Sequence, residues 1–373
     1  MELIEGATEA ASRWQHARNV LCIRLDTIGD VLMTGPAIRA VSEARPDRRI
    51  TMLTSSAGAA AARLLPDIDA VIEYDAPWMK PAPDERPEQD VADELRARAF
   101  DGAVIFTVYS QSALPAAFLC RLAGIPQRLA HCRENPYGLL TDWVREMEPD
   151  QTIRHEVERQ LALVAAVGCA PRDDRMKVRI PADAVDSAER LLTRCGVDRN
   201  RPWCVIHPGA SAPSRRYAAA GFAAAADELV MRDGWQVVFA GGVADVELTR
   251  SIRRMMLAPT VSIAGELELT ELAALISLAP ILIANNSGPA HLASATGTPV
   301  VDLYALTNPQ HTPWRVPAKV LSHDVPCAWC YASVCREGHH DCLRLVSPAR
   351  VAAAARSLYA ETVAPSPAIE VAI

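Results

Sequence analysis

Short apolar runs alternate with amphipathic segments along most of the chain, and the series starts afresh near residue 182. Runs of this kind are typical of strands that are buried on both faces. They are 19–25, 50–54, 70–74, 103–107 and 128–132 in the first series, and 203–207, 235–240, 260–263, 281–284 and 300–304 in the second. Strands that alternate with helices favour a parallel sheet with helices on both of its faces. The sequence therefore predicts an α/β protein with two doubly wound, Rossmann-like domains.

A polar segment, 172–181, separates the two series, and 373 residues exceed what one hydrophobic core usually serves. We therefore expect a first domain over residues 1–175, a second over 182–347, and a C-terminal helix and tail over 348–373. Ligands bind at the carboxyl ends of the strands in such domains, so two in series predict a shared central cleft. The loops at those ends are 26–30, 207–216, 241–242, 265–266 and 285–289.

The charge balance limits the partners of the chain. It has 38 Lys+Arg against 45 Asp+Glu, a formal net charge of −7, whereas nucleic-acid binding needs a basic surface. The first residues include acidic side chains and lack the apolar core of a signal peptide. No apolar stretch reaches the roughly 20 residues of a spanning helix. We expect a cytoplasmic protein with no nucleic-acid partner and at most peripheral membrane contact.

Two common phosphate-binding fingerprints are missing from the sequence. No G-x-G-x-x-G follows the first expected strand, and no G-x-x-x-x-G-K-[ST] occurs anywhere. A dinucleotide dehydrogenase and a P-loop kinase are therefore disfavoured.

Asp30 ends the loop after the first expected strand and stands at the mouth of a helix. Asp is among the best N-cap residues, and a cap contributes about 1 kcal/mol. A carboxylate at the carboxyl edge of a sheet can also serve as a general base. The two roles are compatible, and position alone favours the cap.

Two loops of the second series suit an anionic ligand. The loop 207–216 offers backbone N–H groups around Gly209 and Ser211, followed by Arg215 and Arg216, which suits a phosphate as well as it suits a solvated turn. In the second loop the residues of interest are Asn286, Ser287, Gly288 and His291. Ser287 and Gly288 would present N–H groups at a helix N-terminus, although ordinary capping explains them too, and such a histidine is more often a core residue than a catalyst.

Four of the ten cysteines gather near the C-terminus: Cys327, Cys330, Cys335 and Cys342, with His339 and His340 between them. Four thiolates could hold a structural zinc or iron ion. The spacing is not that of two paired knuckles, so reduced thiols in a turn-rich segment are the alternative.

The order of these pieces resembles glycosyltransferase family 9, the bacterial heptosyltransferases of lipopolysaccharide core assembly. The matching pieces are IRLDTIGDVLMTGPAIRA, HEVERQLALV, HPGASAPSRRY, FAGG, IAGELELTELAALI, NNSGPAHLASATGTPVVDLY and the cysteine segment. The resemblance implies a GT-B fold and an inverting transfer that needs no metal or other cofactor. It also implies the donor ADP-L-glycero-β-D-manno-heptose and a lipopolysaccharide-core or other glycan acceptor, met at the inner membrane.

The resemblance also assigns roles to residues. Asp30 matches the proposed base of the family. Ser214, Arg215, Arg216 and Tyr217 match the stretch that contacts the donor diphosphate, with Arg215 in place of the family's lysine. Asn286 to His291 match the motif along the donor nucleotide, and Gly241 falls in the FAGG piece. Similar cysteine patterns recur in the family.

Three readings stay open on the sequence alone. The leading one is heptose transfer from an ADP-heptose-type donor, with Arg24 and Arg128 as basic residues that could meet an acidic acceptor. A second is a family-9 transferase with another nucleotide sugar, or with a small-molecule or protein acceptor. A third, of another class, is a non-catalytic binding or metal-sensing protein on the same scaffold. The third is disfavoured because Asp30 and both anion loops are present.

Overall fold

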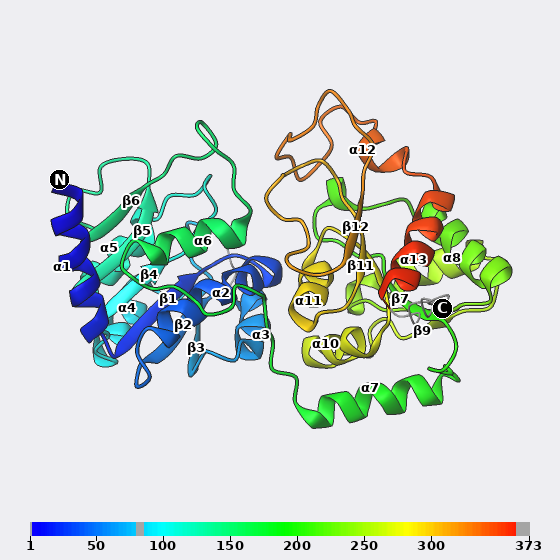
Figure 1. The fold of residues 1–373 in the computed structure, drawn as a ribbon, viewed down its shortest axis with the longest axis horizontal. Coiled ribbons are helices and arrows are strands. Elements are labelled where there is room, and N and C mark those ends of the chain that lie inside the picture. The colour runs from blue at the N-terminus through cyan, green and yellow to red at the C-terminus, as the bar shows by residue number, and fades with distance from the viewer. Residues whose placement is uncertain (1, 80–85, 363–373) are drawn as a thin grey trace, which may run out of the picture. The chain divides into compact units, whose positions relative to one another are not determined.

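The computed structural model describes residues 2–79 and 86–362, so the end of the expected C-terminal helix and tail (348–373) lies outside the described residues. The chain divides into two compact units, Met1–Arg179 and Ile180–Ile373. Each unit holds one six-stranded sheet, and its strands pair in parallel. Figure 1 shows the helices of each unit lying against its sheet. The expected α/β class with two Rossmann-like domains is confirmed.

The first sheet has the order β3-β2-β1-β4-β5-β6. Its strands are β1 (Asn19–Arg24), β2 (Arg49–Thr54), β3 (Ala70–Glu73), β4 (Gly102–Ile105), β5 (Gln127–Cys132) and β6 (Asp142–Arg145). From β1 the chain runs outward to β3 and returns to β4 on the other side of β1. The strand order therefore reverses between β1 and β4, and ligands bind outside the carboxyl ends of strands at such a point.

Helices cover the first sheet from two sides. They are α1 (Glu2–His16), α2 (Ile28–Glu43), α3 (Ser56–Leu64), α4 (Glu88–Ala97), α5 (Leu114–Leu122) and α6 (Glu156–Ala165). α2 packs against α3 and α6, and α4 packs against α5. Leu21 and Ile105 of the sheet share a buried cluster with Val91 of α4 and Leu119 of α5. The other layer, α2 and α6, brings its polar side chains to the carboxyl end of β1.

The second sheet has the order β12-β11-β10-β7-β8-β9. Its strands are β7 (Trp203–His207), β8 (Gln236–Phe239), β9 (Val261–Ser262), β10 (Leu282–Asn285), β11 (Val300–Leu303) and β12 (Ala318–Leu321). Here the strand order reverses between β7 and β10. The loops after these two strands contain the two expected anion-binding motifs, so the topology brings both motifs to one edge of one sheet.

The second unit has more helical elements than strands. They are α7 (Ala182–Arg194), η1 (Pro213–Arg215), α8 (Ala219–Asp233), η2 (Val243–Asp245), α9 (Val246–Met255), α10 (Leu269–Leu278), α11 (Gly288–Thr296), α12 (Asp341–Arg344) and α13 (Pro348–Thr362). α8 packs against α13, and α10 packs against α7 and α11. Ile206, Phe222, Ile283 and Val351 lie in one buried cluster between the sheet and the first of these layers.

Two strands and two α-helices have no counterpart among the segments expected from the sequence. They are β6, β12, α1 and α12. β6 and β12 are edge strands that each include charged residues, so they lack the continuous apolar run that marks a central strand. Among the described residues, no helix combines the length and the apolar character that crossing a bilayer would require.

Candidate active site

Asp30 lies in the first turn of α2, directly beyond the carboxyl end of β1. The N-cap of α2 is Thr27 and Asp30 is the third helical residue, so the expected N-cap role is corrected to that of a capping-box partner. Asp30 Oδ2 accepts hydrogen bonds from the Thr27 backbone N–H at 3.3 Å and from the Thr27 hydroxyl at 3.1 Å. Its Oδ1 accepts from Arg24 Nη2 at 3.2 Å. The Asp30 side chain is 18% exposed, so this oriented carboxylate still reaches solvent.

Arg24, at the end of β1, is fully buried among carboxylates. Its Nη1 donates to Glu156 Oε1 at 2.8 Å, and its Nε lies 2.7 Å from Asp26 Oδ2. Burial by itself lowers the pKa of the guanidinium, but the carboxylates of Asp26, Glu156 and Asp30 outweigh burial and raise it. A guanidinium so enclosed does not face an acceptor. These contacts argue against the expected acceptor contact of Arg24, and one of them is with Asp30.

Arg128, on β5, is also committed to the protein. Its side chain is buried, and its guanidinium donates to the backbone carbonyls of Leu139 and Gly138 and to those of Ile125 and Pro126. These contacts join the segment before β5 to the loop between β5 and β6. They argue against the acceptor contact that the sequence analysis assigned to Arg128.

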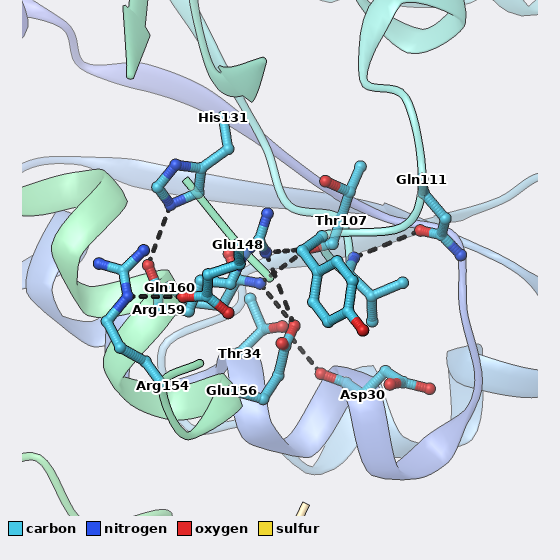
Figure 2. Close-up of polar contacts among 12 residues, drawn as sticks. Asp30, Thr34, Thr107, Gln111, His131, Glu148, Arg154, Glu156, Arg159 and Gln160 are labelled. Atoms are coloured by element: carbon cyan, nitrogen blue, oxygen red, sulfur yellow. Dashed lines mark hydrogen bonds and ion pairs between the residues drawn. The ribbon is translucent and has the colours of Figure 1, made fainter. Parts of the chain in front are cut away.

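A buried polar network continues from Arg24 into α6 through Glu156. Figure 2 shows the part of this network around Glu156, Gln160 and Arg159. Glu156 Oε1 also accepts from Gln160 Nε2 at 2.6 Å, and the same amide donates to the Thr107 carbonyl at 2.9 Å. Arg159 donates to the Thr107 carbonyl and to Glu146. Burial would raise the pKa of Glu146, but the charge and hydrogen bonds of Arg159 prevail and lower it. The network therefore ties α6 to the loop after β4 at the edge where Asp30 lies.

A polar pocket of about 140 Å³ adjoins this network at the ends of β4 and β5. Its lining includes Gln111, Ser112, His131, Arg133 and Glu146. Gln111 Nε2 also donates to Asp26 Oδ1 at 2.6 Å, so one side chain belongs both to the pocket and to the carboxylate group around Arg24. Burial and the Arg159 charge lower the pKa of His131 to about 4, so its imidazole is neutral near pH 7. The pocket thus presents neutral and charged hydrogen-bonding groups.

In the second unit, the fully buried Asn285 joins the two anion loops. It ends β10, and its Oδ1 accepts from the Tyr217 backbone N–H at 2.9 Å while its Nδ2 donates to the Pro208 carbonyl at 2.7 Å. The Ser287 hydroxyl donates to the Asn285 carbonyl at 3.1 Å and lies 3.4 Å from the Gly209 carbonyl. The loops after β7 and β10 therefore form one rigid edge.

The two predicted phosphate arginines have different surroundings. Arg216 is exposed, and its Nε donates to the carbonyl of Ala210 at 2.7 Å. Arg215 is half-buried, and its guanidinium has no hydrogen-bond partner within the described part of the chain. The neighbouring Ser214 is buried and donates to the Ala332 carbonyl at 2.7 Å, so it anchors the loop. Arg215 is therefore the arginine whose donors are available to a ligand.

Gly209 and Gly241 face the same carboxylate. A Cβ at Gly209 would lie 2.3 Å from Asp245 Oδ1, and a Cβ at Gly241 would lie 2.7 Å from Asp245 Cβ. Asp245 Oδ2 accepts from the Gly242 backbone N–H at 3.0 Å. Both glycines, assigned to donor binding from the sequence, thus let Asp245 approach the loops, while Ser211 is exposed beside them.

The 286–291 motif forms the start of α11 as expected. Ser287 is the N-cap, Gly288 is the first helical residue and a proline follows it. Asn286 is buried and donates to the His311 carbonyl at 2.9 Å. His291 is buried too, and its ring packs edge-on against that of His311 at a centroid distance of 6.4 Å. The Ser287 and Gly288 amides begin a helix, which favours an anion there.

Asp302, on β11 beneath these loops, is a buried acid that the sequence analysis missed. Burial raises its pKa to about 8, and Asn286 and Arg215 offset only part of that effect. An unfolded aspartate releases its proton near pH 4. The folded state therefore holds one more proton than the unfolded state between these values, and it loses stability as the pH rises.

Replacing Asp302 by asparagine should remove this pH dependence. In wild-type protein the free energy of unfolding should fall by up to about 1.4 kcal/mol per pH unit between roughly pH 4 and pH 8. The Asp302→Asn variant should be more stable than wild type, by more at pH 8 than at pH 5. Denaturant unfolding at both values measures the difference. Asp227→Asn, the same substitution in α8, is the control. If the free energy of unfolding changed with pH by the same slope in wild type and in Asp302→Asn, the prediction would be contradicted.

The four clustered thiols lie close together but do not form a coordination shell. Burial raises the pKa of Cys342, and the nearby thiols of Cys335, Cys327 and Cys330 add to the effect. Cys327 Sγ lies 3.8 Å from His339 Nε2. Within residues 2–79 and 86–362, no group of three or more His, Cys, Asp or Glu side chains is arranged to hold a metal ion. The predicted zinc or iron therefore stays a prediction.

Solved structures share this architecture. A glycosyl transferase family 9 structure from Veillonella parvula DSM 2008 matches with a TM-score of 0.77 and 23% identity, covering 92% of this chain and 98% of that one. The E. coli ADP-heptose lps heptosyltransferase II matches with a TM-score of 0.72 and 23% identity, over 92% and 99% of the two chains. The fold is that of the GT-B glycosyltransferases.

The sequence comparisons specify the family. The family model described as "Glycosyltransferase family 9 (heptosyltransferase)" matches residues 89–340. The lipopolysaccharide heptosyltransferase 2 of Escherichia coli (strain K12) is 26% identical over 345 residues, which are 89% of this chain and 96% of that protein. The chain therefore belongs to glycosyltransferase family 9 and is a glycosyltransferase.

Proposed function

We propose that this enzyme transfers a heptose from an ADP-heptose-type donor to a hydroxyl of a lipopolysaccharide-core or similar glycan acceptor. The observation that carries the proposal is the carboxylate of Asp30. Hydrogen bonds from Thr27 and Arg24 orient it at the point where the strand order of the first sheet reverses. Two joined anion loops lie at the corresponding edge of the second sheet. The E. coli relatives, named for ADP-heptose and lipopolysaccharide, support this donor and acceptor class.

In the proposed reaction Asp30 accepts the proton of the acceptor hydroxyl. The hydroxyl oxygen then forms a bond to the anomeric carbon of the donor sugar as the bond from that carbon to the diphosphate oxygen breaks. The electron pair of the broken bond leaves with ADP. One displacement of this kind inverts the anomeric configuration.

The departing diphosphate gains negative charge, and the second unit offers groups that stabilise it. Arg215 and Arg216 supply guanidinium donors, and the N-terminus of α11 supplies the Ser287 and Gly288 amides. These positively charged or partially positive groups support a reaction without a divalent ion. In the first unit, the pocket beside Gln111 is the proposed position of an acceptor sugar. We expect the reaction at the cytoplasmic face of the inner membrane, where such an acceptor would be met.

A donor panel tests the proposal. Purified protein should be incubated with ADP-heptose, other ADP-sugars and UDP-sugars, each with and without a core oligosaccharide, and the products followed by mass spectrometry. We expect heptose transfer from ADP-heptose only when the acceptor is present. Turnover of a UDP-sugar in preference to ADP-heptose would overturn the donor assignment. The absence of binding and turnover with every donor would favour a non-catalytic protein.

A structural metal ion in the cysteine segment is a separate proposal, which elemental analysis can test. If Cys327, Cys330, Cys335 and Cys342 hold a structural ion, purified protein should contain near-stoichiometric zinc or iron. A chelator should then lower the melting temperature more than it lowers turnover at a permissive temperature. A Cys195→Ser variant, altered outside the segment, should keep the metal. Metal-free protein of normal stability would establish the reduced-thiol alternative.

A further inference from the structure

Glu156, the first residue of α6, is fully buried, and its carboxylate pairs with the buried guanidinium of Arg24 at 2.8 Å. Its Oε1 accepts from Arg24 and Gln160, while its Oε2 has no hydrogen-bond partner among the described residues. A buried carboxylate costs more desolvation free energy than an amide of the same shape. A glutamine at this position could accept the same two hydrogen bonds. The helix N-terminus favours the charge only modestly.

The position of Glu156 also allows its charge to act on Asp30. One guanidinium, that of Arg24, contacts Glu156 through Nη1 at 2.8 Å and Asp30 through Nη2 at 3.2 Å. The two carboxylates therefore compete for the same positive charge. An unshared guanidinium would stabilise the ionised form of Asp30 more strongly and make it a weaker base. Without Glu156, the plane of the guanidinium would also lose one of its three anionic contacts.

We propose that Glu156 is a positioning residue for Asp30: through Arg24 it fixes the direction of the Asp30 carboxylate and keeps that carboxylate basic enough to accept a proton. The inference rests on the proposed role of Asp30 as the base. It concerns a residue that never touches the substrate, and its contact with Arg24 joins positions 132 residues apart in the sequence.

Other charged groups lie around Glu156 and Asp30, and they are the same in wild type and in the Glu156 variants. Asp26 shares Arg24 with both carboxylates, and burial raises the pKa of Asp26. Arg159 Nη1 lies 4.0 Å from Glu156 Oε1 and pairs with Glu146 on its other side. His131 contacts the Arg159 carbonyl and is neutral above about pH 5, because its pKa is lowered to about 4. Further out, Glu148 pairs with Arg154 at 2.6 Å.

The test is the Glu156→Gln variant, which keeps the shape and removes the charge. The acidic limb of its kcat/KM profile should move to lower pH by about 0.5–1 unit, because Arg24 then acts more strongly on Asp30. Its kcat at pH 7 should fall by about 3- to 10-fold, as expected of a weaker base. ADP affinity should match wild type, and the melting temperature should fall, because the buried Arg24 guanidinium loses one carboxylate partner. Glu158→Gln, on the exposed side of the same helix, should change none of these quantities.

Further variants distinguish a failure of this inference from a failure of the proposed base. Glu156→Asp keeps the charge and shortens its reach, so its kcat should fall while its pH midpoint stays near that of wild type. If Glu156→Gln does not fold, a wild-type kcat in Glu156→Asp overturns the inference. If Asp30→Asn is inactive and Glu156→Gln has the wild-type pH profile, the inference alone fails. If Asp30→Asn turns over normally, the proposed base itself is wrong.

Discussion

Replacing Asp30 by asparagine is expected to lower turnover by about 10²–10⁴-fold, the usual contribution of general-base catalysis, or roughly 2.7–5.5 kcal/mol of barrier. The amide oxygen can still accept from Thr27, so the capping box of α2 persists. Arg24 keeps Asp26 and Glu156 as partners, so the fold and the ADP affinity should persist too. The capacity to take a proton is lost together with the ion pair to Arg24. Steady-state measurement of ADP release gives the rate.

Two further variants control this result. Asp30→Ala should lose the same activity and, in addition, about 1 kcal/mol of stability, because the capping contact is lost as well. Asp101→Asn should keep the wild-type rate: Asp101 accepts from the backbone N–H groups of Arg18 and Asn19 at the opposite end of β1. Near wild-type turnover of Asp30→Asn would reduce Asp30 to a capping residue, and the base would have to be another group, with His291 the first to examine.

Replacing Arg215 and Arg216 together by alanine is expected to weaken ADP binding strongly. Each charged hydrogen bond to the diphosphate contributes about 1.5–3 kcal/mol, which corresponds to about a 10- to 150-fold change in Kd. Arg215→Ala alone should cause the larger part of the loss, because Arg216 already donates to the Ala210 carbonyl. Isothermal titration calorimetry with ADP measures each variant.

A matched surface arginine separates a local effect from a general loss of positive charge. Arg232, at the far end of α8, is 71% exposed and lies 3.5 Å from Glu228. Arg232→Ala should bind ADP as wild type does. Unchanged ADP affinity in the double variant would remove Arg215 and Arg216 from the phosphate site and leave only the α11 N-terminus as its proposed anion contact.

Much of the fold was predictable because central parallel strands are buried on both faces and leave continuous apolar runs. The runs at 203–207 and 281–284 correspond to β7 and β10, whose bounds differ from the prediction by at most a residue or so. The motif loops could be placed at the carboxyl ends of β7 and β10, because each follows an apolar run and precedes a helical segment, but their composition alone did not separate an anion site from a turn or a helix cap. Edge strands such as β6 carry no such signal.

The site itself was harder to predict, because its supporting residues are distant in sequence. Nothing in the local sequence distinguishes a buried arginine such as Arg24 from a surface one, so its burial among three carboxylates could not be foreseen. In the sequence, Glu156 appears only within HEVERQLALV, one of the pieces that resemble the family. Its contact with Arg24 depends on how α6 packs on α2. Asp245 and Asp302 likewise become notable only in the folded second unit, where Asp245 lies against Gly209 and Gly241 and Asp302 is buried on β11.

The measurement that tests the account most directly is the anomeric configuration of the product. Protein, ADP-heptose of defined configuration and a core oligosaccharide should be incubated together, and the new linkage assigned by NMR from its one-bond carbon–proton coupling. The account predicts a heptose linked with the configuration opposite to that of the donor, formed by wild-type enzyme and not detectably by Asp30→Asn over the same time. A product that retains the donor configuration, or no heptose transfer by the wild-type enzyme, would contradict it.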